Sequence, residues 1–344
     1  MSGGDFFSPQ ASGAATLKIS LPEAMKDMFR NTFKFSRTDV DGMDALYHNF
    51  QAALVQTLAG IDIENPNMFV LRGAKLINPT TYEREYDHPT TADAFLAAQD
   101  AIQDPSGVCL GVALYADKTT TSTIGNLEYY PVYYQVMNCT LAYYTKAISK
   151  GIVGFLPVIK APNRSKGKTK KKTIPAALKE LIYQAYQHHW RELLKHVRVV
   201  CRDGFKYQAR GTKNPVRKLY PRLLMFLGDH PELQGVCGCS NSSQAVRGCR
   251  VCMVFSNLFD LVVPEPEQKT QLGDLRTIGE LQDFRYAMEA LAEEPGTVTA
   301  RRKEFAQRSV QTTNPAFYEV KFDAPILEVS VASRRGDVRV SPVG

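Results

Sequence analysis

Long apolar runs are missing from this sequence. No stretch approaches the roughly eighteen consecutive apolar residues that a membrane-spanning helix needs. The opening segment, MSGGDFFSPQASGAATLKIS, lacks the charged-then-apolar pattern of a secretory signal. Cysteine is also scarce, and its odd count of seven fits a reducing compartment better than a disulfide framework. We therefore expect an intracellular protein that does not enter a membrane.

Acidic residues are scarce in the middle of the chain. Between Lys160 and Arg222 there are 18 Lys or Arg residues against three Asp or Glu, a net charge of +15. Because the whole chain carries +7, the remainder carries about −8. A basic middle between acidic ends is typical of a protein that binds a polyanion, most commonly nucleic acid. The apolar content of 44% is sufficient for the core of one large domain or two ordinary ones.

The N-terminal part of the chain has a helical pattern. Residues 1–16 are rich in Gly, Ser and Ala, and we expect them to be disordered. Residues 17–105 are expected to be mostly helical, because apolar residues recur at three-to-four spacing over 21–61. A capped helix is predicted over 90–104, and strand-like sequence occurs at 68–77.

From residue 106 the apolar pattern becomes strand-like. The runs GVCLGVALYAD, LEYYPVYYQVMNCT and KGIVGFLPVIK are rich in β-branched and aromatic residues, and their short connections favour an antiparallel three-strand meander. An amphipathic helix is predicted over 174–197, followed by a hairpin about Asp203-Gly204. The segment PRLLMFLGDHPE, residues 221–232, is predicted to be another buried strand that ends on an aspartate.

This order of elements predicts an α/β (α+β) fold with a ribonuclease-H-like mixed sheet over residues 106–260. The helix and hairpin would be inserted within a basic segment, 160–222. In such folds the first and fourth strands lie side by side, so Asp117 and Asp229 would meet at one edge. Two carboxylates held together repel each other unless a cation lies between them. They are therefore candidate ligands of a two-metal phosphoryl-transfer site; for Asp117 alone, the alternative is a turn residue after a strand.

The same stretches resemble a known protein family. GVALYADKTTTSTIGNLEYYPVYYQVMN, KGIVGFLPVIKAP, FLGDHPELQGVCG and GCRVC are similar to Plavaka-type transposases, of the wider CACTA/KDZ group of cut-and-paste elements. The resemblance covers roughly residues 106–256, with a weaker echo at 314–325. It implies that Asp117 and Asp229 are the first two acids of a DDE/D triad that binds Mg²⁺ or Mn²⁺.

The resemblance does not identify the third acid of the triad. In this group the third acid lies well downstream, but the family-like sequence ends near Pro325, within a region expected to be helical over 261–325 and then irregular over 326–344. Several carboxylates lie in the helical part, and none is assigned the role: Glu280, Asp283, Glu289, Glu293 and Glu294. We therefore expect weak or no catalysis from this chain alone.

Four cysteines form two close pairs within residues 237–252. The spacing C-x-C-x9-C-x2-C, in VCGCSNSSQAVRGCRVC, matches a small structural zinc knuckle, with four reduced thiols or a redox pair as the alternative. Their positions are Cys237, Cys239, Cys249 and Cys252, with His230 as a substitute ligand. The remaining three, Cys109, Cys139 and Cys201, lie in strand-like runs and are expected to be core thiols.

Basic residues beside these motifs are candidate DNA contacts. Lys118 follows the first aspartate directly and could contact a phosphate or simply occupy a solvated turn. The run KGKTKKK is either a solvated loop or a contact with the DNA backbone, and it would also serve as a nuclear-import sequence. Its lysines are Lys166, Lys168, Lys170, Lys171 and Lys172.

Two further groups attract attention but have simpler explanations. His188 and His189 are adjacent on a predicted helix, so at most one can face a given site, and we favour core or surface packing. The tyrosine-rich segment from Tyr129 to Tyr144 could stack nucleic acid bases, but tyrosine is also a strong strand former and sheet packing is favoured.

Together these features predict a nuclear transposase-derived protein that binds DNA and cleaves phosphodiesters with divalent metal in its intact relatives. The alternative is a non-catalytic DNA-binding or interaction protein descended from such an enzyme. A third acid close to Asp117 and Asp229 would favour the enzyme.

Overall fold

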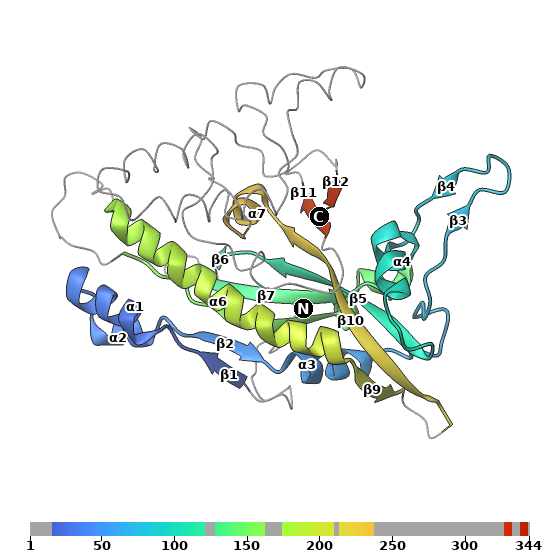
Figure 1. Cartoon of the computed structure of the whole chain (residues 1–344), viewed down its shortest axis with the longest axis horizontal. Coiled ribbons are helices and arrows are strands. Elements are labelled where there is room, and N and C mark those ends of the chain that lie inside the picture. Colours follow the sequence, from blue (N-terminus) through green and yellow to red (C-terminus); the bar gives the residue numbers. More distant parts are fainter. Residues whose placement is uncertain are drawn as a thin grey trace, which may run out of the picture.

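A computed structural model describes residues 16–120, 128–161, 174–209, 213–236, 327–331 and 338–342 (Figure 1). Most of the N-terminal segment expected to be disordered, the lysine run, the four clustered cysteines and the region 261–325 lie outside these ranges. In the described part of the chain, no helix is both long enough and apolar enough to cross a membrane.

The N-terminal region contributes two strands as well as helices. Its elements are β1 (Thr16–Ile19), α1 (Glu23–Asp27), a π-helical turn η2 (Met28–Thr32), α2 (Arg37–Asp41), β2 (Ala45–His48) and α3 (Phe50–Leu58). The helical prediction over 21–61 is therefore wrong at β2, which pairs antiparallel with β1. The reason is a short alternation: Ala45 and Tyr47 are buried while Leu46 is exposed, and Asn49 then caps α3 by accepting from the Ala52 N–H.

A small two-stranded sheet and a helix follow. They comprise β3 (Leu76–Ile77), β4 (Arg84–Glu85), the 3-10 turn η3 (Pro89–Thr91) and α4 (Asp93–Asp100). Helix α4 confirms the central part of the helix predicted over 90–104. Of the strand-like sequence at 68–77, only the last two residues form a strand, while Phe69 makes a single bridge to Cys139.

The predicted antiparallel meander is confirmed. It consists of β5 (Gly107–Ala116), β7 (Glu128–Val136) and β8 (Lys150–Leu156). The short strand β6 (Thr119–Thr120) pairs with β7, and α5 (Leu141–Tyr144) and η4 (Ala147–Ser149) connect β7 to β8. Strand β2 pairs with β8 and extends the sheet at that side.

The long helix α6 (Ala176–Asp203) confirms the helix predicted over 174–197 but continues six residues further. The hairpin predicted about Asp203-Gly204 is therefore wrong. Val197 and Cys201, four residues apart, are both buried and continue the apolar stripe of the helix. Gly204 ends the helix with a φ of 63°, and the hairpin that does form joins β9 (Phe205–Gln208) to the start of β10 (Val216–Gly228).

Strand β10 is the central strand of the second half of the sheet. It lies parallel to β5 on one side and parallel to β11 (Leu327–Val331) on the other, and β11 pairs with β12 (Val338–Pro342). The sheet order is β1-β2-β8-β7-β5-β10-β11-β12, and α7 (His230–Val236) follows β10. Two strands thus form within 326–344, where an irregular tail was predicted; ILEVSV and VRVSP carry enough alternating β-branched residues to pair.

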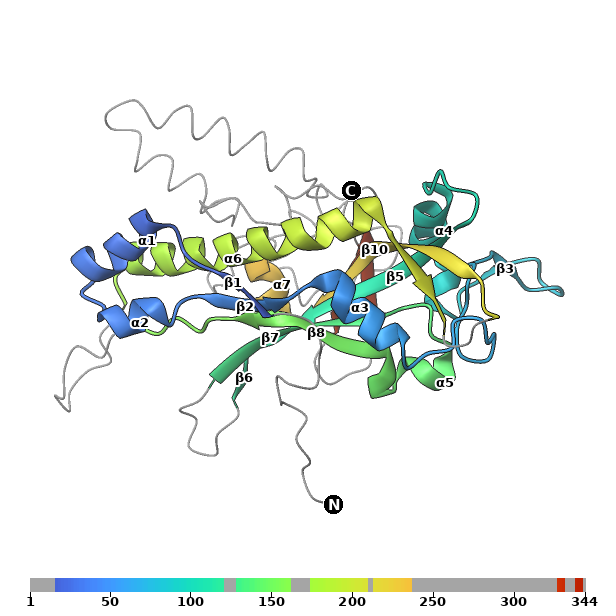
Figure 2. The ribbon, with the colours of Figure 1, turned by 90° about the horizontal axis from the view of Figure 1, so that it is seen from below.

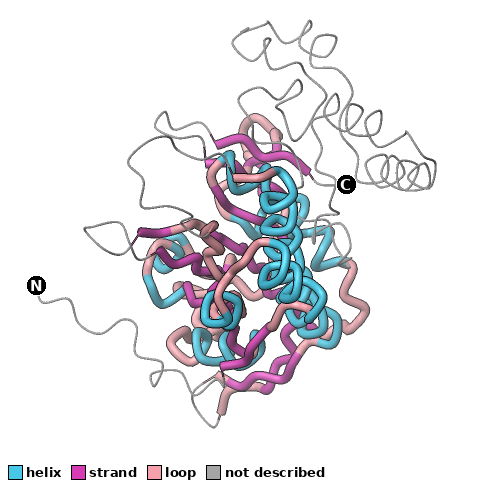
Figure 3. The backbone as a smooth tube through the Cα atoms, turned by 90° about the vertical axis from the view of Figure 1, so that its left-hand side faces the viewer, coloured by secondary structure: helices cyan, strands magenta, loops and turns pink. Residues whose placement is uncertain are grey.

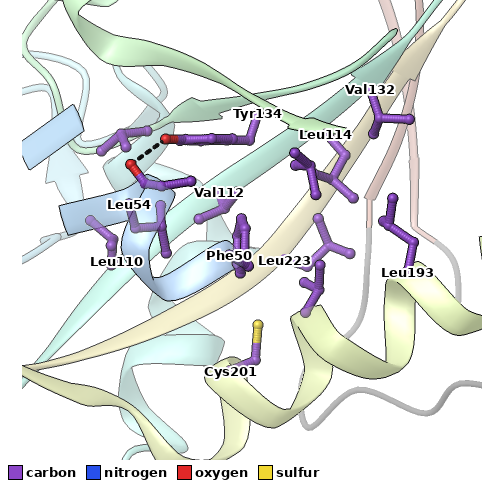
Figure 4. Close-up of a cluster of buried hydrophobic side chains, with 14 of the residues drawn as sticks. Phe50, Leu54, Leu110, Val112, Leu114, Val132, Tyr134, Leu193, Cys201 and Leu223 are labelled. Atoms are coloured by element: carbon purple, nitrogen blue, oxygen red, sulfur yellow. Dashed lines mark hydrogen bonds between the residues drawn. The ribbon is translucent and has the colours of Figure 1, made fainter. Parts of the chain in front are cut away.

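Both faces of β5 are covered, which explains why its sequence is almost continuously apolar. Leu110, Val112 and Leu114 pack into the main core beneath α3 and α6, whereas Cys109 and Ala113 face the opposite way and pack with Phe95 of α4. Figure 4 shows the main core, with side chains from α3, β5, β7, β10 and α6 converging on one another. Figure 2 shows α6 running along the length of the sheet, and Figure 3 shows the helices packed against the strands.

Candidate active site

Asp117 and Asp229 follow two adjacent parallel strands. The register of β5 and β10 ends with Tyr115 opposite Leu227, and Asp117 and Asp229 each lie two residues further along the chain. The prediction that the strands ending on these two aspartates lie side by side is confirmed. Asp117 is half-buried and Asp229 is exposed, so this end of the sheet is accessible from solvent.

The carboxylate of Asp117 is held by a tyrosine on its own strand. Tyr115 Oη donates a hydrogen bond to Asp117 Oδ2 at 2.9 Å, and its ring stacks on Tyr133 of β7 with 6.1 Å between centroids. Burial raises the pKa of Tyr115 above its usual value, and the hydrogen bond and charge of Asp117 and the charge of Asp229 raise it further. One hydroxyl therefore responds to both aspartates, which supports their proximity.

Asp229 begins helix α7. Its Oδ1 accepts a hydrogen bond from the backbone N–H of Glu232 at 2.8 Å, and its carbonyl accepts one from Leu233 at 3.0 Å. This is the arrangement of an N-cap aspartate, which satisfies a backbone donor that the first helical turn leaves without a partner. The direction of Asp229 is therefore coupled to the position of α7.

Glu232 brings a third carboxylate to this end of the sheet. Tyr186 Oη of α6 donates a hydrogen bond to Glu232 Oε1 at 2.6 Å. Burial, as the main cause, and the charge of Asp117, as the second, together raise the pKa of Glu232 to about 8. Gly228 makes room for this side chain, because a Cβ atom there would lie 3.3 Å from Glu232 Cγ. Glu232 was not predicted from the sequence, because its contact with Tyr186 joins elements that are distant in the chain.

Lys118, which follows Asp117 in the sequence, and Lys160 both pair with Glu128. Lys118 Nζ forms an ion pair with Glu128 Oε2 at 2.9 Å, and Lys160 Nζ approaches the same atom at 3.1 Å. Lys118 therefore neutralises Glu128, and a contact with phosphate stays a prediction. Thr119 Oγ1 donates to the carbonyl of Asp117 at 3.4 Å, and Thr119 itself lies in the short strand β6.

The two histidines on α6 each contact a backbone carbonyl of the N-terminal region. His189 is buried, with Nε2 at 2.9 Å from the carbonyl of Met43, and burial lowers its pKa to about 4. His188 Nε2 lies 3.1 Å from the carbonyl of Ser20. Cys109, Cys139 and Cys201 are buried core thiols, as expected, and burial raises the pKa of Cys109 and Cys139 to about 12.

The donor set at the strand ends suits a hard divalent cation. Carboxylate oxygens are the ligands that Mg²⁺ and Mn²⁺ prefer, and Mg²⁺ sites commonly combine one or two carboxylates with water and substrate phosphate. The pKa of Glu232 is raised first by burial and then by the charge of Asp117, and a bound cation would offset that charge. Within the described ranges, however, no three or more His, Cys, Asp or Glu side chains form a complete metal-binding group.

Comparison of the sequence with known protein families identifies its family. The family model of Plavaka transposase matches residues 38–300, more than half of the chain. The chain belongs to the Plavaka transposase family. No relative was found among curated proteins. Membership implies DNA as the partner, and it confirms the resemblance drawn from the strand and aspartate motifs; the match also extends on both sides of the region that carried it.

Proposed function

We propose that this Plavaka family protein is a transposase-derived DNA-processing protein whose reaction centre lies at Asp117 and Asp229. The observation that supports the proposal is the register of β5 and β10, two adjacent parallel strands whose carboxyl ends are directly followed by Asp117 and Asp229. In a family whose substrate is DNA, paired carboxylates at that place serve metal-dependent phosphodiester cleavage and strand transfer.

The sheet supports a ribonuclease-H-like core. If β5, β7, β8, β10 and β11 are taken as strands one to five of that core, the sheet order is three-two-one-four-five. The first three strands pair antiparallel, whereas the fourth and fifth run parallel to the first and fourth, respectively. In such a fold the first and fourth strands are expected to be neighbours, as β5 and β10 are. The N-terminal strands β1 and β2 extend the sheet beyond β8.

The roles of the chain's own residues follow from their surroundings. Asp117 and Asp229 would hold Mg²⁺ or Mn²⁺, which polarises the phosphodiester and activates the attacking hydroxyl or water. Each aspartate has one oxygen engaged in a hydrogen bond to this chain, Oδ2 of Asp117 and Oδ1 of Asp229, so the other oxygen is the one to offer to an ion. The exposure of Asp229 gives the DNA backbone access to this edge of the sheet.

Three features of the proposal concern residues outside the described ranges. The cysteines at 237, 239, 249 and 252 would hold a structural zinc ion, with the spacing of a four-thiolate knuckle. The lysines at 166, 168, 170, 171 and 172 would contact the DNA backbone and direct the protein to the nucleus. A third triad acid remains unassigned, and for this reason we expect weak cleavage from the chain alone.

Manganese-dependent nicking of supercoiled plasmid tests the proposal. The wild-type protein should convert a small fraction of plasmid to the nicked form, and Asp117→Asn and Asp229→Asn should not. Asp100→Asn on α4, an exposed acid whose removal also adds one positive charge, is the matched control and should nick like wild type. Equal nicking by all four proteins would point to a contaminating nuclease and refute the assignment.

The second candidate is a non-catalytic DNA-binding protein, and the charge of the chain favours it. The segment 160–222 carries a net +15 whether or not the acidic site is functional. Fluorescence anisotropy with a labelled duplex separates the two possibilities. Tight binding by wild type and Asp117→Asn, together with no nicking by either, would select the non-catalytic function.

A further inference from the structure

Each of the two aspartates accepts a hydrogen bond from this chain. A tyrosine hydroxyl bonds one aspartate directly and, for the other, bonds the residue that holds it. Tyr115 binds Asp117 directly, at 2.9 Å. Asp229 is bonded to the backbone N–H of Glu232 at 2.8 Å, and the side chain of Glu232 is in turn held by Tyr186 at 2.6 Å. The orienting groups come from β5 and α6, two of the longest elements of the described structure, and not from loops.

Tyr115 is itself held in place. Its ring stacks on Tyr133 of the neighbouring strand, and its backbone lies within the register of β5 between β7 and β10. A phenol fixed in this way leaves Asp117 little freedom to rotate while its Oδ2 is engaged. Hydrogen bonds of this kind to ligand carboxylates tune metal affinity, because they remove the need to order the ligand when the ion arrives.

Tyr186 acts at a longer range. It contacts Tyr130 of β7 through its hydroxyl, at 3.1 Å, and its ring lies edge-on to the buried Trp190. Two neighbouring residues of α6 also hold α7, since Tyr183 and Gln187 both donate to the carbonyl of Gly235 at 2.9 Å. Helix α7 is therefore docked on α6 by polar contacts, and the Tyr186–Glu232 bond is the one closest to Asp229.

We propose that Tyr115 and Tyr186 are positioning residues of the Asp117–Asp229 site, Tyr115 by orienting Asp117 and Tyr186 by holding the Glu232 turn that orients Asp229. This inference rests on the proposed function, because it concerns the affinity of the same site for a divalent cation. Neither tyrosine needs to touch the ion or the DNA. The aspartates supply the ligands, and the tyrosines determine how well these are preorganised.

The test measures Mn²⁺ binding directly, without DNA or turnover. Electron paramagnetic resonance of free Mn²⁺ gives the dissociation constant for each variant of the full chain. Tyr115→Phe should weaken binding about 10- to 100-fold, the typical effect of removing such a partner, and Tyr186→Phe should weaken it less because it acts through Glu232. Both substitutions keep the ring and remove only the hydroxyl.

The chain offers matched controls for the loss of a tyrosine hydroxyl. Tyr220 donates to Asp104 Oδ2 at 3.2 Å at the opposite end of the same strand pair, so Tyr220→Phe removes a comparable bond far from the site. Tyr47 contacts His196 on α6 at 2.8 Å, and Tyr47→Phe removes a bond to the same helix as Tyr186. Both controls should bind Mn²⁺ like wild type. Their melting temperatures without metal show how much stability the protein loses when a tyrosine hydroxyl is removed.

The outcomes separate this inference from the proposed function. If Asp117→Asn abolishes Mn²⁺ binding but Tyr115→Phe binds as tightly as Tyr220→Phe, the positioning role is refuted and the metal site stands. If wild type and Asp117→Asn bind Mn²⁺ equally, or neither binds, both the site and the positioning role are wrong. Weakened binding in Tyr115→Phe, at a melting temperature equal to that of the control, supports the inference.

Discussion

Tyr186 donates a hydrogen bond to the carboxylate of Glu232 at 2.6 Å, and this bond joins α6 to α7 beside the ends of β5 and β10. The consequence is that a helix lying along the sheet also fixes the direction of the short helix that Asp229 caps. A site at the ends of strands would otherwise depend on loop residues for its geometry. Here the long helix contributes to the order of the site without supplying a ligand.

Divalent cations should stabilise the folded protein if the two aspartates bind them. An ion that binds only the native state raises the free energy of unfolding by about 2.7 kcal/mol at a concentration one hundred times its dissociation constant. We expect MgCl₂ or MnCl₂ to raise the melting temperature of wild type and to leave that of Asp229→Asn unchanged. Calorimetry with NaCl of equal ionic strength controls for general salt effects, and equal shifts in both proteins would contradict the site.

The buried imidazole of His189 makes stability depend on pH. Burial lowers its pKa to about 4, against 6.5 in the unfolded chain, so the unfolded state binds the proton more readily. Its contribution is complete above pH 6.5 and is lost as the pH falls towards 4, by about 3 kcal/mol in total. Urea unfolding of wild type and His189→Gln across this range should show a steeper pH dependence in wild type; parallel curves would exclude the histidine as the cause.

The turn after α6 requires glycine. Gly204 has a φ of 63° and a ψ of −178°, and a Cβ atom there would lie 2.8 Å from the carbonyl oxygen of Leu219. Gly204→Ala should therefore lower the free energy of unfolding by about 1–3 kcal/mol. Gly235→Ala in α7 is the control, since a Cβ atom there meets nothing within 4 Å, and it should be neutral or slightly stabilising. Equal effects in urea unfolding would contradict the argument.

Asn138 is a buried polar residue whose side-chain amide forms hydrogen bonds through both its oxygen and its nitrogen. Its Oδ1 accepts from the N–H of Gly111 at 2.8 Å, and its Nδ2 donates to the carbonyls of Val70 and Cys109 at 2.8 and 3.0 Å. Asn138→Asp keeps the shape but removes both donated bonds and buries a charge, so it should cost several kcal/mol, on the order of 3–5. Asn67→Asp, on an exposed residue, should change stability little.

The sequence predicted best those helices and strands whose apolar residues follow one clear pattern over many positions. The meander, α6 and the pairing of β5 with β10, the strands that Asp117 and Asp229 follow, were predicted from long apolar runs. It failed at β2, where four residues of alternation lie within a helical pattern, and at the end of α6, where VRVV is compatible with either state. Glu232 was missed because its importance depends on the docking of α7 against Tyr186, a tertiary contact that no local pattern records.

Salt dependence provides a test of the lysine run that needs no catalysis. Neutralising Lys168, Lys170, Lys171 and Lys172 together with glutamine should weaken binding to any duplex sequence, because phosphate contacts carry no base information. Each lost phosphate contact should also reduce the slope of log affinity against log salt concentration by about 0.9. Anisotropy titrations between about 50 and 200 mM NaCl, the range over which this effect is large, measure both quantities.

Lys18→Gln and Lys195→Gln, on β1 and α6, control for net charge, because both lysines already pair with acids of this chain. An unchanged slope in the fourfold variant would remove the lysine run from the interface, and the basic residues of α6, β9 and β10 would then have to account for the affinity.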